Sequence, residues 1–77
     1  MSEPLDLRGV VCPLNFVKAK IALEPLADGE TLEILLDDGE PVRNVPRSLK
    51  DDGDEIVSLE RRPEGHWLAN VRKKART

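Results

Sequence analysis

The 77-residue chain has few residues that support chemistry: one cysteine, one histidine, one tryptophan, one phenylalanine and no tyrosine. A single cysteine excludes an internal disulfide and a Cys-x-x-Cys exchange site. Cys12 and His66 together supply too few nitrogen and sulfur ligands for a metal site, so no metal is expected. No Gly-x-Gly-x-x-Gly or Gly-x-x-x-x-Gly-Lys segment is present to hold a nucleotide, and no cofactor is expected. The thiol of Cys12 is the remaining candidate for chemistry.

Long apolar segments are also lacking. No run approaches the roughly 20 residues that span a membrane, and the first residues, Met-Ser-Glu-Pro, lack the basic and apolar regions of a signal peptide. We therefore expect a cytoplasmic protein without membrane contact.

The charge and aromatic content argue against direct nucleic-acid binding. The net charge is −3, and the two aromatic residues, Phe16 and Trp67, are expected in the core rather than on a stacking surface. Bases cluster near the end of the chain, in Arg72-Lys73-Lys74-Ala75-Arg76. We expect residues 72–77 to form a frayed basic tail of a single domain that covers residues 1–77.

Hydrophobic periodicity predicts six elements in the order β-α-β-α-β-β. A strand–helix–strand crossover implies a parallel first pair of strands, and a short Pro- and Gly-containing turn implies an antiparallel last pair. With only two helices, the prediction is a two-layer α/β (α+β) sandwich, a four-stranded mixed sheet with both helices on one face. The predicted ranges are 5–7, 13–26, 31–36, a second helix from Asn44 or Pro41 to Asp51, 56–61 and 66–73.

The first predicted helix has a wide apolar stripe that is expected to face the core: Leu14, Phe16, Val17, Ala19, Ile21, Leu23 and Leu26. Lys18 and Lys20 are expected on the exposed side. There they are candidates for contact with an acidic partner, although a simple solvated surface explains them equally.

Cys12 directly precedes a proline that suits the first position of a helix. This spacing predicts that Pro13 begins the helix and that Cys12 is its N-cap. The sulfur would then lie beside the unpaired backbone N–H groups of the first turn, which favour a thiolate over a thiol. The alternative is a buried cysteine with a structural role.

The segment Asp6-x-Arg8-Gly9-x-x-Cys12-Pro13 resembles the motif of the TusA/SirA-like family of small sulfur carriers. The resemblance continues through Gly29-Glu30, Asp37-Asp38 and Arg43-Asn44-Val45-Pro46. The family motif usually ends Cys-Pro-x-Pro, whereas this chain has Asn15 at the last position. Asn15 restores a backbone donor and adds an amide, so it is a candidate for tuning partner choice or thiol acidity.

Two residues of the motif are expected to shape the loop before the helix. Gly9 permits a tight backbone. Arg8 either supplies positive charge near the thiol or forms an ion pair with Asp6; a purely structural role is equally open.

The resemblance implies a sulfur relay: Cys12 would accept persulfide sulfur from a cysteine desulfurase or rhodanese-type donor and pass it to an acceptor protein. Destinations in the family include tRNA thiolation, molybdenum-cofactor assembly and sulfur oxidation. Whether such a carrier acts as an enzyme in its own right is left open. The alternatives are a redox or regulatory module that forms a mixed disulfide at Cys12, and an interaction domain with an inert thiol.

Overall fold

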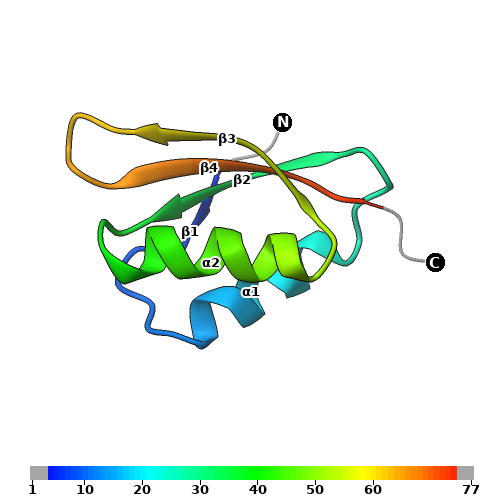
Figure 1. Cartoon of the computed structure of the whole chain (residues 1–77), viewed down its shortest axis with the longest axis horizontal. Coiled ribbons are helices and arrows are strands. Elements are labelled where there is room, and N and C mark those ends of the chain that lie inside the picture. Colours follow the sequence, from blue (N-terminus) through cyan, green and yellow to red (C-terminus); the bar gives the residue numbers. More distant parts are fainter. Residues whose placement is uncertain (1–3, 75–77) are drawn as a thin grey trace.

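The computed structural model describes residues 4–74, and its elements follow the predicted order β-α-β-α-β-β. The four strands form one mixed sheet, and both helices cover the same face of it (Figure 1). The predicted two-layer sandwich is therefore confirmed. The elements are β1 (Leu5–Asp6), α1 (Leu14–Leu23), β2 (Thr31–Leu36), α2 (Glu40–Asp51), β3 (Glu55–Arg61) and β4 (Trp67–Arg72).

The strands lie in the order β1-β2-β4-β3. As predicted, β1 pairs with β2 in parallel and β3 pairs with β4 antiparallel. The central pair is β2 and β4, which run antiparallel with Thr31 opposite Arg72 and Leu36 opposite Trp67. The last hairpin closes through the predicted turn, where the Arg62 N–H donates to the carbonyl of His66 at 2.8 Å.

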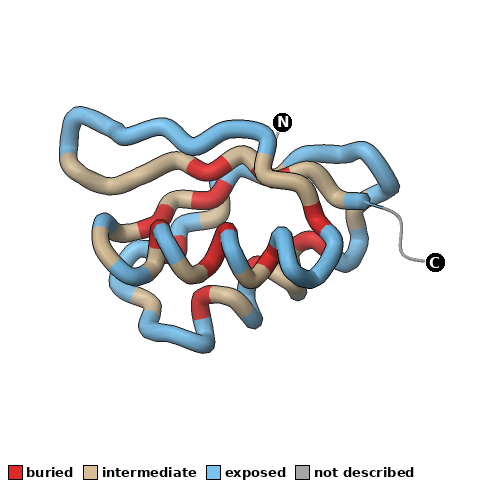
Figure 2. The backbone as a smooth tube through the Cα atoms, in the orientation of Figure 1, coloured by how far each residue is buried: buried red, intermediate tan, exposed pale blue. Residues whose placement is uncertain are grey.

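The core lies between the sheet and the two helices. Figure 2 shows the buried residues on the inner sides of the helices and along the central strands. Alternation along β2 places Ile34 and Leu36 in this layer, and Ala69 and Val71 of β4 lie beside them. The other buried apolar residues are Leu7, Ala19, Leu23, Val42, Val45 and Leu49.

Helix α2 begins four residues before Asn44, so the prediction that Asn44 caps it is wrong and the alternative start near Pro41 is confirmed. Gly39 is the N-cap and has a φ of 99°, a value that glycine adopts without strain. Pro41 then lies in the first turn, where its missing N–H costs nothing. Pro46 lies inside the helix and is buried, which the sequence pattern did not anticipate.

Residues 72–74 are more ordered than predicted. Arg72 belongs to β4, and Lys73 exchanges backbone hydrogen bonds with residues 29 and 30 at 2.8 Å each. The Lys74 N–H donates to Asp54. A frayed tail from residue 72 is thus wrong for residues 72–74, while residues 75–77 lie outside the described residues, as do Met1–Glu3. Within residues 4–74, neither helix is long and apolar enough to cross a membrane.

Candidate functional site

Cys12 lies in the loop between β1 and α1, and its side chain is exposed. This position excludes a buried structural cysteine. The helix begins at Leu14 with Pro13 as its N-cap residue, so the prediction that Cys12 is the N-cap is wrong by one residue. The reason is the backbone of Pro13, whose φ of −95° and ψ of 9° depart from helical values.

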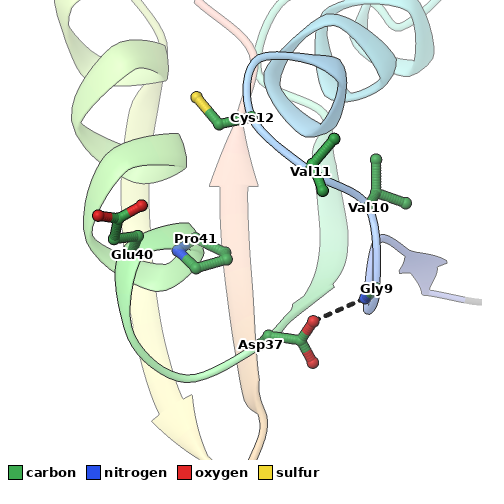
Figure 3. Close-up of a pocket in the computed structure, with 7 residues that line it drawn as sticks. All are labelled: Gly9, Val10, Val11, Cys12, Asp37, Glu40 and Pro41. Carbon is green, nitrogen blue, oxygen red and sulfur yellow. Dashed lines mark hydrogen bonds between the residues drawn. The ribbon is translucent and has the colours of Figure 1, made fainter.

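A groove of ≈ 400 Å³ opens beside Cys12. One wall is the loop of residues 9–12, and the facing wall consists of Asp37, Glu40 and Pro41 at the end of β2 and the start of α2 (Figure 3). The walls combine apolar surface with two carboxylates. The thiol therefore borders an open groove that another molecule can enter.

The facing wall was not predicted as part of the site. Helix α1 and strand β2 separate Asp37 and Glu40 from Cys12 along the chain. The parallel pairing of β1 with β2 brings these two acidic residues alongside the cysteine loop. The available signal was the acidic pair Asp37-Asp38, which directly follows the strongest predicted strand.

Asp37 holds the cysteine loop in place. Its Oδ2 accepts a hydrogen bond from the Gly9 N–H at 2.6 Å, and Gly9 has a φ of 79°. The next residue, Val10, donates its N–H to the Leu7 carbonyl at 3.1 Å. The predicted tight backbone at Gly9 is therefore confirmed, and it is fixed against the facing wall of the groove.

Arg8 forms the ion pair with Asp6 that the sequence allowed. Its Nε and a terminal nitrogen donate to the two carboxylate oxygens at 2.9 and 2.8 Å, and its backbone N–H donates to Oδ1 at 3.1 Å. These hydrogen bonds lower the pKa of Asp6 from 3.8 to about 2. The guanidinium charge of Arg8 is thus largely matched by Asp6 next to it in the chain.

The first turn of α1 differs from the prediction. The Asn15 N–H donates to the Val11 carbonyl at 3.1 Å, the Phe16 N–H to Asn15 Oδ1 at 2.7 Å, and the Val17 N–H to the Pro13 carbonyl at 3.1 Å. Of these three donors, the Asn15 N–H was expected to lie unpaired beside the sulfur, and it is bonded to oxygen instead. The expectation that it stabilises a Cys12 thiolate is therefore wrong, while the Val17 bond is an ordinary intrahelical one.

Helix α1 also presents a different face to the core than predicted. Its buried residues are Asn15, Ala19 and Leu23, spaced four apart. Ala19 and Leu23 belong to the predicted stripe and are buried as expected. Three other members of the stripe, Leu14, Val17 and Ile21, are exposed instead, together with Val11 in the preceding loop. We call these four the outer face of α1; their exposed fractions are 69% for Val11, 52% for Leu14, 42% for Val17 and 64% for Ile21.

The two lysines of α1 have different environments. Lys18 is exposed, as predicted. Lys20 bonds instead to Asp52 and, at 2.9 Å, to Asp54, which is only 3% exposed, so its predicted placement on the solvated side is wrong. Burial lowers the pKa of Lys20, but hydrogen bonds to the two carboxylates outweigh it and the net shift is upward. Lys20 thereby ties α1 to the segment that follows α2.

Comparisons with a family model and with related proteins agree on the same family. The model of the family described as Sulfurtransferase TusA matches residues 3–73. An Archaeoglobus fulgidus protein described as a candidate sulfur carrier is 41% identical over 73 residues, which cover 95% of this chain and 83% of the relative. A Thermotoga maritima protein with the same description is 31% identical over 74 residues, covering 96% and 94%.

A solved structure has the same fold. The crystal structure of a SirA-like protein from Desulfitobacterium hafniense matches with a TM-score of 0.78 and covers 94% of this chain and 97% of its own. Its sequence identity is 22%, so the likeness concerns the fold.

Proposed function

The chain belongs to the TusA sulfurtransferase family, and from this premise we propose that it is a sulfur-relay carrier whose Cys12 accepts and releases persulfide sulfur. The observation that supports the proposal is the exposure of Cys12 beside an open groove. It is the chain's sole cysteine, so no second thiol is present to compete for the sulfur or to release it as a disulfide.

The chemistry is exchange at sulfur. The Cys12 thiolate attacks the outer sulfur of a donor persulfide, a new S–S bond forms, and the donor's own S–S bond breaks to release its thiolate. One sulfur atom and its proton move with the bond, and the negative charge passes to the donor, so no oxidant is consumed. A nucleophile of the acceptor then attacks the outer sulfur on Cys12, and Cys12 leaves as a thiolate.

The donor is a cysteine desulfurase or a rhodanese-type protein, and the acceptor is a downstream protein of the same relay, in the cytoplasm. The outer face of α1 supports protein partners, because it offers apolar surface in direct continuation of Cys12. Fully burying an exposed side chain of this kind contributes about 1.5–3 kcal/mol, and covering the exposed part of these side chains would contribute a share of that. Lys18, exposed on the same helix, suits a partner with an acidic residue at that place.

The test is direct sulfur loading. The protein is incubated with a cysteine desulfurase and L-cysteine, and its intact mass is measured. We expect a gain of about 32 Da, one sulfur atom, which a reducing thiol removes. Cys12→Ser is the matched control: it should keep the wild-type circular dichroism spectrum and gain no mass, because an alcohol forms no persulfide.

Two outcomes contradict the proposal. If neither a desulfurase nor a rhodanese-type donor adds sulfur while Cys12 still reacts with iodoacetamide, the protein is not a carrier for these donors. If Cys12 instead accumulates as a mixed disulfide with a partner, the redox or regulatory alternative is favoured.

A further inference from the structure

Among residues 4–74, Asn15 is the one wholly buried polar residue beside the candidate site. Its exposed fraction is 0%, although it lies only three positions after the exposed Cys12. Burying an amide is costly unless its polar atoms find partners, and an unsatisfied group costs about 1–3 kcal/mol. The contacts of Asn15 therefore show what it does for the fold.

The hydrogen bonds of Asn15 described below are made with the cysteine loop or with the turn that follows it. The side-chain Nδ2 donates to the Val10 carbonyl at 3.4 Å, and the backbone N–H donates to the Val11 carbonyl at 3.1 Å. The side-chain Oδ1 accepts the Phe16 N–H at 2.7 Å. One residue thus binds the two carbonyls immediately before Cys12 and the first turn of the helix immediately after it.

The loop is held on its other side as well. Gly9 is bonded to Asp37, and Val10 is bonded to Leu7. With Asn15 holding Val10 and Val11 from inside, the backbone on the N-terminal side of Cys12 is fixed at three successive residues. Cys12 follows directly on this frame and is one of the residues that line the groove (Figure 3).

We propose that Asn15 is a positioning residue: its buried amide holds the backbone before Cys12 and so fixes the position and orientation of the Cys12 sulfur at the groove. The inference rests on the proposed function in that Cys12 is taken as the sulfur carrier. A proline at this position could not donate a backbone hydrogen bond to the Val11 carbonyl or a side-chain hydrogen bond to the Val10 carbonyl. Where proline would restrict the backbone through its ring, Asn15 holds the loop through these two hydrogen bonds. Asn15 acts through Cys12 and does not itself touch the sulfur donor.

Two substitutions separate its contacts. Asn15→Leu has a similar size and removes both side-chain bonds. Asn15→Asp keeps the acceptor for Phe16 and removes the donor to Val10. Leu23→Ala is the matched control, because Leu23 is equally buried on α1 but lies two turns away from the loop. It lowers stability without touching the frame around Cys12.

The first measurement is sulfur transfer from a desulfurase at increasing carrier concentration, so that kcat and KM are resolved. A misplaced reacting atom slows the chemical step, and we expect kcat to fall about 10- to 100-fold in Asn15→Leu, with KM nearly unchanged because the outer face of α1 is intact. Leu23→Ala should keep kcat within about 2-fold at a temperature where both variants are folded. Equal losses of kcat in the two variants, or a wild-type kcat in Asn15→Leu, would overturn the proposal.

The second measurement does not depend on sulfur. Amide hydrogen exchange of residues 10–12 should speed up in Asn15→Leu and Asn15→Asp, and stay as in wild type in Leu23→Ala. Unchanged exchange in both Asn15 variants would overturn the proposal even if they fold poorly elsewhere. If the wild-type protein takes up no sulfur but amide exchange of residues 10–12 is faster in the two Asn15 variants, the proposed function fails and the anchoring role of Asn15 stands.

Discussion

The two helices lie side by side on the same sheet but are attached to it in different ways (Figure 1). Helix α2 has one apolar face, with Val42, Val45 and Leu49 buried at helical spacing. Its other side is polar, as expected for a surface helix. Helix α1 is apolar on both sides, and the side that faces the core contains an asparagine and an alanine. One apolar face of α1 therefore packs in the core, and the other, its outer face, remains exposed.

The attachment of α1 depends strongly on polar anchors. Asn15 bonds to the loop before the helix, and Lys20 bonds to Asp54 in the segment after α2. Leu23 and the small Ala19 supply its buried apolar contact, and the partly buried Phe16 packs against the same core. Stability is therefore expected to come mainly from α2, and the placement of Cys12 mainly from α1. The predictions below test this division.

The largest expected effect is on α2. Leu49 is fully buried, so Leu49→Ala removes its apolar contacts and leaves a cavity. We expect the free energy of unfolding to fall by about 2–5 kcal/mol. Ile21→Gln on the outer face of α1 should change it by only about 0.5 kcal/mol, because that side chain is 64% exposed. Urea denaturation of both variants measures the difference, and equal losses would show that the outer face is packed within the fold.

A smaller effect is expected in partner binding. The double variant Leu14→Gln, Ile21→Gln keeps good helix formers and removes two apolar side chains of the outer face. We expect the Kd for the sulfur donor to rise about 10-fold or more, since a few buried apolar residues dominate such interfaces. Calorimetry measures it. Leu59→Gln is the control: Leu59 is 40% exposed on the edge strand β3, outside the groove.

An unchanged Kd for the double variant, or an equal rise for Leu59→Gln, would contradict docking on the outer face. Sulfur loading from a small-molecule persulfide should stay at the wild-type rate in the double variant, because Cys12 and its loop are untouched.

The smallest effect is expected in acid. In the folded protein the pKa of Asp6 is lowered from 3.8 to about 2 by its bonds to Arg8, so its contribution to stability is full above the unfolded value and disappears as pH falls through about 2. The difference in stability between wild type and Asp6→Asn should therefore shrink between about pH 4 and pH 2. Thermal unfolding across that range measures it. A constant difference would show that the ionised Asp6–Arg8 pair contributes nothing to stability.

A second carboxylate contact that depends on pH lies just before α2, between Asp38 and Trp67. The Trp67 indole N–H donates to Asp38 at 2.9 Å and lowers the pKa of that carboxyl. The same sign applies: this bond stabilises the fold at neutral pH and is lost in acid. It joins the turn before α2 to β4, whereas the Asp6–Arg8 pair joins residues two apart in the chain.

Sequence reasoning was accurate where a pattern is local and repeated. It predicted β2 residue for residue, the closing hairpin and the end of α2, because alternation and turn residues act on neighbouring positions. It was less accurate at helix starts. Cys12 and Asn44 were both plausible caps, but the structure places the caps at Pro13 and Gly39. Propensity ranks such candidates closely, and packing chooses between them.

For the site, the sequence identified Cys12 and the Asp6–Arg8 pair, whose residues lie close together in the chain. It missed the wall of Asp37, Glu40 and Pro41, because that contact depends on the pairing of β1 with β2. It also placed Leu14, Val17 and Ile21 inside. Periodicity shows that a helix has apolar residues on a face, but it does not show which of two such faces a sheet will cover.

By itself, then, the sequence determined the order of elements, the sandwich architecture and the one candidate for thiol chemistry, Cys12, since these follow from local patterns and from a single cysteine. The tertiary structure decided which side of α1 is buried, what lies opposite Cys12, and that Asn15 and Lys20 turn inward as anchors. The physical reason is that these depend on contacts between residues far apart in the chain. Such contacts form only when the helices close over the sheet.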